Sequence, residues 1–176
     1  MQHFQIKIFA RPESHPDLGQ AIPVFHRWIQ ESEPSRRLID VADYRHVPAG
    51  PGVILVGHDA IYGLDESGNR LGLLYSRRTT RDGSPYENLR DAYDSAVATM
   101  HKLEAESAFA GQLSFKDDEC EIAVNDRAAA PNTPETEAAL KPVVAQLLDE
   151  VWGQGKYTLN RVGEPRDLLR FHATKS

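Results

Sequence analysis

The sequence predicts an α+β fold, with a mainly antiparallel sheet of about six to eight strands and about three helices packed on one face. Three observations support this prediction. Short segments of alternating polar and apolar residues are separated by turn-forming residues, as in antiparallel hairpins. Longer segments with apolar residues at helical spacing follow Ser-Pro or Thr-Pro pairs. The order of segments lacks the regular strand–helix alternation of a doubly wound parallel fold.

The chain opens with a predicted strand and a helix. Residues 5–10 (QIKIFA) alternate polar and apolar side chains, as a half-buried strand does. Residues 21–31 repeat apolar side chains at helical spacing, which favours a helix. A strand with Phe25, Arg27 and Ile29 on one face is the alternative for this second segment.

The next part of the chain reads as strands joined by turns. Residues 37–44 (RLIDVADY) are predicted to form a strand that ends at the PAGPG run of residues 48–52. Residues 52–64 are then predicted as one long strand. A turn at residues 66–69 and a return strand over residues 70–78 complete an antiparallel hairpin.

The second half begins with the strongest helix signal in the chain. Residues 84–87 (SPYE) form a capping-box sequence with proline at the first helical position, and the helix is predicted to end near Ser107. Residues 112–115 and 120–125 are apolar and flank the polar residues 116–119, which predicts a second hairpin.

A third helix and two closing strands complete the prediction. The helix begins at the Thr-Pro pair of residues 133–134 and ends at Gly153. Pro142 lies only about two turns into it and predicts either a kink or a later start. Residues 156–160 and 168–174 are predicted as strands.

Length and charge limit the organisation and the partners. The 176 residues suit a single domain, or two tightly packed halves joined near residues 79–84. The net charge of −6 is carried entirely by residues 85–176, because the basic and acidic residues before them balance. An acidic half repels nucleic acid and anionic membranes, so neither is expected as a partner.

Cysteine usage and hydropathy predict a cytoplasmic protein. Cys120 is the only cysteine in the sequence and cannot form an internal disulfide, which favours a reducing compartment. No apolar run is long enough for a signal peptide or a membrane-spanning helix. Catalysis by Cys120 is disfavoured, because the carboxylates around it in DDECEI raise the pKa of a thiol.

The first candidate anion site is an arginine cluster. Arg77, Arg78 and Arg81 precede the helix that begins at Pro85. Arginines beside the free N–H groups of a helix N-terminus bind phosphate or carboxylate well. The alternative is a solvated turn whose arginines pair with carboxylates of the acidic second half.

The second candidate site is the triplet Asn125, Asp126 and Arg127, at the end of a predicted strand. Such loops often carry function because rigid elements position them. Asp126 suits a base, Arg127 an anion clamp and Asn125 an orienting donor. The alternative is local capping and turn formation by Asn and Asp. Whether residues 125–127 converge in space with residues 77–81 is left open.

The third candidate is a metal site built from His26, Asp43, His46 and His58. Imidazole and carboxylate groups are the ligands of zinc, manganese and non-haem iron. The spacing matches no known metal motif, so separately hydrogen-bonded polar residues are the alternative.

The leading functional hypothesis is binding of a small anion or a protein partner, with a homodimer as a further option. The alternative is a metal-dependent hydrolase that uses the His/Asp set. The sequence names no cofactor, and it leaves open the ligand and whether any reaction is catalysed. Its segments resemble no family of known activity.

Overall fold

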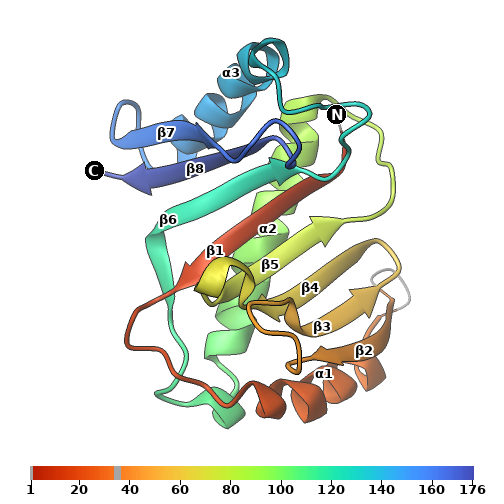
Figure 1. Ribbon diagram of the computed structural model, residues 1–176. Helices are drawn as coiled ribbons and strands as arrows, with labels where there is room; N and C mark the ends of the chain where they lie inside the picture. The colour runs from red at the N-terminus through yellow and green to blue at the C-terminus, as the bar shows by residue number, and fades with distance from the viewer. Residues whose placement is uncertain (1, 34–36) are drawn as a thin grey trace.

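The computed structural model describes residues 2–33 and 37–176, and the strands within them form one antiparallel sheet (Figure 1). Its order is β2-β3-β4-β5-β1-β6-β8-β7. The eight strands are β1 (Phe4–Ala10), β2 (Leu38–Tyr44), β3 (Gly52–Gly57), β4 (Ala60–Asp65), β5 (Gly72–Arg77), β6 (Phe115–Val124), β7 (Tyr157–Val162) and β8 (Arg170–Lys175).

Three α-helices cover one face of this sheet, which confirms the predicted α+β fold (Figure 1). They are α1 (Ala21–Gln30), α2 (Pro85–Glu104) and α3 (Pro134–Val151). Helix α1 packs against β2, α2 against β1 and β5, and α3 against α2 and β7. The short turn η3 (Ser67–Asn69) lies in front of the sheet in Figure 1, on the face that carries no α-helix. We call that face the open face. Two other short turns are η1 (Leu18–Gln20) and η4 (Ser107–Phe109).

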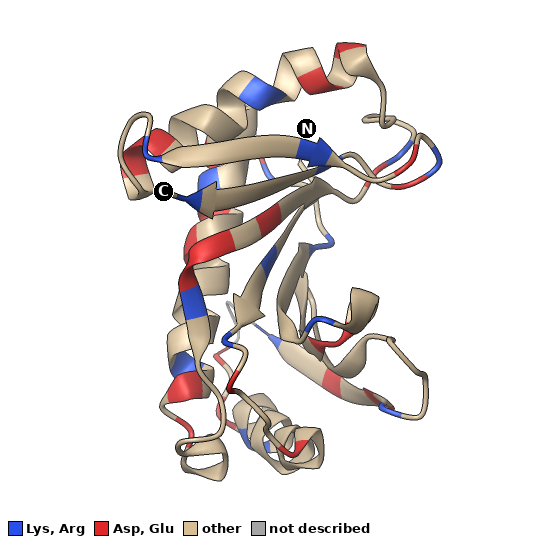
Figure 2. Cartoon of the chain, turned by 60° about the vertical axis from the view of Figure 1, so that its left-hand side comes forward, with Lys and Arg blue, Asp and Glu red and all other residues tan. Residues whose placement is uncertain are grey.

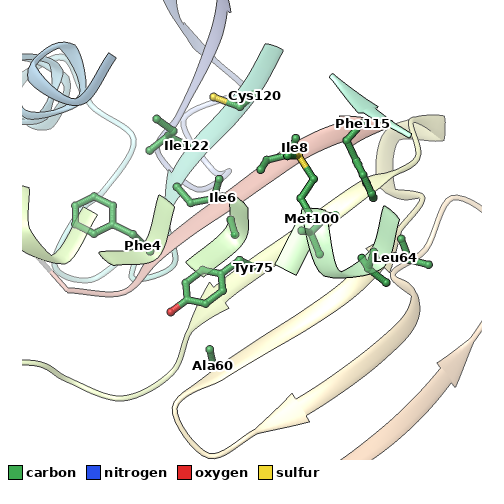
Figure 3. Packing of buried hydrophobic residues seen from close by; sticks show 14 of the residues in the cluster. Phe4, Ile6, Ile8, Ala60, Leu64, Tyr75, Met100, Phe115, Cys120 and Ile122 are labelled. Carbon is green, nitrogen blue, oxygen red and sulfur yellow. The ribbon is translucent and has the colours of Figure 1, made fainter. Parts of the chain in front are cut away.

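The central strand β1 joins the two halves of the chain, because it pairs with β5 on one side and β6 on the other. Its alternation separates the two faces of the sheet. Phe4, Ile6 and Ile8 are buried in the core beneath the helices (Figure 3). The alternate side chains point to the open face, where Gln5, Lys7 and Phe9 line a shallow cavity. One strand therefore supplies both the core and the opposite, polar surface.

The helix signals in the sequence act as predicted. The Ser84 hydroxyl accepts a hydrogen bond from the Glu87 backbone N–H, and the Glu87 carboxylate accepts one from the Ser84 N–H. The Thr133 hydroxyl accepts a hydrogen bond from the Thr136 backbone N–H, and α3 begins at Pro134 rather than later. Pro142 lies inside α3, which continues without interruption to Val151.

Two predicted segments were wrong, and the errors offset each other in the strand count. Residues 52–64 form two strands, β3 and β4, separated by a tight turn at His58 and Asp59. The Asp59 carbonyl accepts a hydrogen bond from the Arg78 backbone N–H, and the Asp59 carboxylate accepts one from the Thr79 hydroxyl. Contacts with the residues that follow β5 therefore fix this turn. Residues 116–119 do not turn, because β6 continues through them, with a shift of its register against β1 between Phe115 and Cys120.

In the part of the chain that the structure describes, no helix has the length and apolar character needed to cross a membrane.

The two-sided character of β1 predicts a large effect of truncating its core face. Ile6→Ala removes a fully buried side chain beneath α2, so it should lower the free energy of unfolding by about 2–5 kcal/mol. Ile39→Ala is the matched control, because Ile39 is 51% exposed on the edge strand β2. Urea unfolding of both variants checks this. Similar losses of unfolding free energy in the two variants would contradict the assignment of Ile6 to the core face of the sheet.

Candidate functional site

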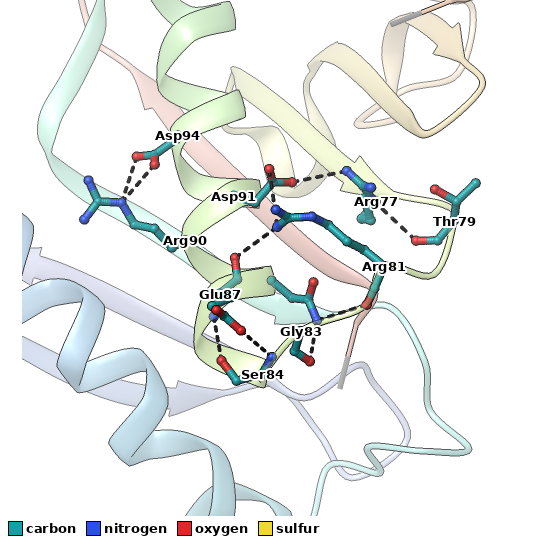
Figure 4. Close-up of polar contacts among 10 residues, drawn as sticks. Arg77, Thr79, Arg81, Gly83, Ser84, Glu87, Arg90, Asp91 and Asp94 are labelled. Atoms are coloured by element: carbon teal, nitrogen blue, oxygen red, sulfur yellow. Dashed lines mark hydrogen bonds and ion pairs between the residues drawn. The ribbon is translucent and has the colours of Figure 1, made fainter. Parts of the chain in front are cut away.

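The arginines before α2 are engaged by groups of the chain itself (Figure 4). The Arg77 guanidinium lies 3.2 Å from the Asp91 carboxylate, and that of Arg81 lies 3.5 Å from it. Arg78 turns away and donates a hydrogen bond of 2.8 Å to the Gly57 carbonyl. The capping box already engages the Glu87 backbone N–H, and Pro85 has no N–H to offer. Asp91 and the capping carboxylate thus occupy the positions that an external anion would take.

The triplet at the end of β6 divides into a turn residue and two cavity residues. The Asp126 carboxylate accepts hydrogen bonds from the backbone N–H groups of Ala128 and Ala129, which closes a turn. Asn125 and Arg127 instead line a cavity of about 620 Å³ beside the loop between β7 and β8. We call it the arginine cavity, and its lining residues are Asn125, Arg127, Val162, Gly163, Arg166, Asp167, Leu168 and Arg170.

The arginine cavity contains guanidinium N–H groups that are available to a ligand. Arg127 uses one guanidinium N–H on the Arg166 carbonyl, at 2.8 Å. Arg170 is 3.2 Å from the Glu121 carboxylate. Within residues 2–33 and 37–176, no hydrogen bond or ion pair is found for the Arg166 guanidinium. Asp167 is the only carboxylate in the lining, and it accepts the Glu164 backbone N–H. The cavity therefore offers more positive than negative charge to a ligand.

The two predicted arginine-bearing loops start together and then separate. β5 and β6 both pair antiparallel with β1, so they run in the same direction and their C-terminal ends lie close to each other. The Asn125 amide reaches the Ser76 hydroxyl there, at 3.4 Å. Beyond that point Arg77 turns to α2, whereas Arg127 turns to the β7–β8 loop. Arg77 and Arg127 line two different cavities.

The four residues of the predicted metal site do not come together. His26 is exposed on α1, and Asp43 forms an ion pair with Arg45 that lowers the pKa of Asp43 to about 2. His46 stacks on the ring of Tyr44. His58 pairs with Asp59 at the far end of β3, roughly 15 Å along the strand from Asp43. Among the residues that the structure describes, no group of three or more potential ligands is placed to hold a metal ion.

Cys120 faces the helices rather than solvent, and it lies in the core (Figure 3). Burial, followed by the nearby carboxylates of Glu121 and Glu119, raises the pKa of its thiol to about 12. A thiol in this state supplies no thiolate nucleophile at neutral pH.

The residues that the sequence reasoning missed lie on the open face. Lys7 is buried against Asp65, with 2.5 Å between its Nζ and the carboxylate. Glu119 receives hydrogen bonds from Arg70, Lys116 and His172. The signal for Lys7 was present, because the alternation of QIKIFA places Lys7 on the other face of the strand from Ile6 and Ile8. Its partners come from other strands, and their register was not visible in the sequence.

A second basic cavity lies where β1 leaves the sheet. Its volume is about 670 Å³. It lies between the loop after β1, the loop between β2 and β3, and η3, and we call it the loop cavity. Its charged and imidazole-bearing lining residues are Arg11, His15, Arg45, Glu66, Arg70 and Lys116.

No known family model matches the chain, and no curated protein matches it in sequence. We therefore infer its function from these sites.

The network at Glu119 predicts a dependence of stability on pH. Burial alone would raise the pKa of Glu119, but hydrogen bonds from Lys116, His172 and Arg70 outweigh it and hold the pKa at about 2. The ionised side chain therefore stabilises the fold above its unfolded-state pKa of about 4.3, and this stabilisation is lost as pH falls towards 2.

Glu119→Gln should accordingly lower the free energy of unfolding by about 1–3 kcal/mol at pH 7. The gap between wild type and variant should narrow as pH falls below about 4. Urea unfolding from pH 7 to pH 2.5 checks this, with Asp117→Asn at an exposed carboxylate as control. A gap that stays constant over this range would show that the Glu119 charge does not contribute.

Proposed function

We propose that this protein binds a small multivalent anion, a phosphate or a polycarboxylate, in the arginine cavity. One observation carries the proposal. Arg127, Arg166 and Arg170 line a single cavity together with the amide of Asn125, and its one carboxylate is held by a backbone N–H. Guanidinium groups match carboxylate and phosphate oxygens in two-point hydrogen bonds, and a neutral amide donor adds direction.

The proposal assigns binding rather than catalysis to the triplet at residues 125–127. Asp126 was the candidate base, and its carboxylate is engaged by two backbone N–H groups of the turn. In this proposal Asn125 acts as the donor and Arg127 as the clamp, and Arg166 and Arg170, which line the same cavity, act with them. Arg77, Arg78 and Arg81 are left out of the proposed site because none of them lines this cavity. Arg77 and Arg81 instead share the Asp91 carboxylate.

The arginines of the cavity are solvent-accessible, and this sets the expected behaviour of binding. Arg127 and Arg166 are both exposed. Charge pairs near the surface are screened at ordinary ionic strength, where the Debye length is about 8–10 Å. Binding of citrate or pyrophosphate should therefore weaken steeply as salt is raised. An anion at 100 times its dissociation constant should stabilise the fold by about 2.7 kcal/mol.

Replacing the two exposed arginines should abolish this stabilisation. The double variant R127A/R166A removes two of the three guanidinium groups of the cavity, so citrate and pyrophosphate should no longer raise its melting temperature. Differential scanning fluorimetry, followed by calorimetric titration, measures the effect. Arg78→Ala is the matched control, because it removes an arginine that directly follows the neighbouring strand β5 but lies outside the cavity. Anion binding that is lost in R78A and retained in R127A/R166A would overturn the proposal.

A further inference from the structure

A separate cavity lies between α1 and α2 on the helix-covered face of the sheet, and we call it the helix cavity. Among the strands, α1 packs mainly against β2 and β3, and α2 packs against β1 and β5. β4 lies between these two pairs of strands in the sheet (Figure 1). The helix cavity has a volume of about 250 Å³ and shares no lining residue with the arginine cavity.

The sheet side of the helix cavity is largely apolar. It is lined by Leu38 at the start of β2, Leu55 on β3 and Tyr62 on β4. Trp28 of α1, which is 3% exposed, lines it from the helix side. An apolar cavity of about 150 Å³ holds a benzene molecule. The helix cavity therefore has room for a phenyl ring or a branched aliphatic group together with the atoms that join it to a polar end.

The charged residues that line the helix cavity are Lys102, Glu31 and Glu33, and all three are exposed. The Lys102 Nζ lies 4.0 Å from the centre of the Trp28 ring. Among the residues that the structure describes, the Lys102 ammonium forms no hydrogen bond and no ion pair. The Glu31 carboxylate is 3.8 Å from the Arg27 guanidinium, which is a long ion pair.

The charge of Lys102 is only partly compensated by its surroundings. Burial of part of its side chain lowers the pKa of Lys102, and the nearby carboxylates of Glu31 and Glu106 oppose this effect without cancelling it. Glu106 is itself engaged by the Arg27 guanidinium and by the Trp28 indole N–H, at 2.6 Å from the indole nitrogen. A ligand carboxylate at the edge of the cavity would thus gain a charge-assisted hydrogen bond from Lys102.

We propose that the helix cavity binds a zwitterion with an apolar side chain, an α-amino acid of the phenylalanine or leucine type. The ligand carboxylate pairs with Lys102, its ammonium pairs with Glu31, and its side chain lies against the apolar residues of the sheet. A simple carboxylate fits less well, because two carboxylates and one ammonium line the cavity. A simple amine would leave Lys102 unpaired. A zwitterion complements charges of both signs.

Calorimetric titration with L-phenylalanine, L-leucine and two analogues tests the proposal. Phenylpropanoate lacks the amino group of phenylalanine, and phenylethylamine lacks its carboxylate. L-Phenylalanine should bind at least tenfold more tightly than either analogue, because each analogue loses one of the two charged contacts. L-Leucine should bind as well, because the proposed contacts of its charged groups are the same.

Variants locate the binding within the molecule. Lys102→Met removes the ammonium but keeps an unbranched apolar side chain, so it should weaken L-phenylalanine binding at least tenfold. The same variant should not weaken phenylethylamine binding, since that probe has no carboxylate. Lys141→Met is the matched control, because Lys141 is also an exposed lysine of a helix but lies on α3. The R127A/R166A variant should bind L-phenylalanine as the wild type does.

Four outcomes would overturn the proposal. No binding of L-phenylalanine or L-leucine at millimolar concentration would remove the site. Equal affinity for L-phenylalanine and either analogue would show that a simple carboxylate or a simple amine suffices. Unchanged L-phenylalanine binding in K102M would place the ligand outside the helix cavity. Loss of L-phenylalanine binding in R127A/R166A would assign the ligand to the arginine cavity instead.

Discussion

The buried ion pair between Lys7 and Asp65 ties the open face to the fold. Lys7 Nζ bonds both the Asp65 carboxylate and the Ser67 carbonyl, and that carboxylate also accepts the Ser67 N–H and hydroxyl. These contacts hold η3 against the central strand. Removing either partner alone would leave an uncompensated buried charge, at a cost of about 3–5 kcal/mol. The pair therefore fixes η3, and the residue after this turn, Arg70, lines the loop cavity.

The sequence was informative where a local signal decides the structure. Alternation in β1, the capping box at Ser84 and the Thr-Pro start of α3 each act within one element, and each prediction was confirmed. The predictions failed where contacts between distant parts of the chain determine the structure. The turn at His58 and Asp59 is fixed by the end of β5. The polar residues of β6 stay in the strand because β1 pairs with the residues on either side of them, Phe115 and Cys120. Likewise, Arg166 joins Arg127 only through the tertiary fold.

Side chains of both charges lie on both faces of the sheet. Acidic residues recur along α2 and α3 and appear as repeated red segments (Figure 2). On the open face, carboxylates hold basic side chains in place, as Glu119 holds Arg70 and Asp65 holds Lys7. The exposed Arg166 differs from them, because its guanidinium forms no ion pair among the residues that the structure describes. It therefore supplies the arginine cavity with charge that the fold does not neutralise.

The most direct test of the proposed anion site is a map of backbone amide chemical shifts during titration with pyrophosphate. We expect the largest changes at Asn125 and in the loops around Arg127 and Arg166, while α2 and α3 change little. Changes concentrated on the helices, or before α2 at Arg77 and Arg81, would contradict the assignment of binding to the arginine cavity.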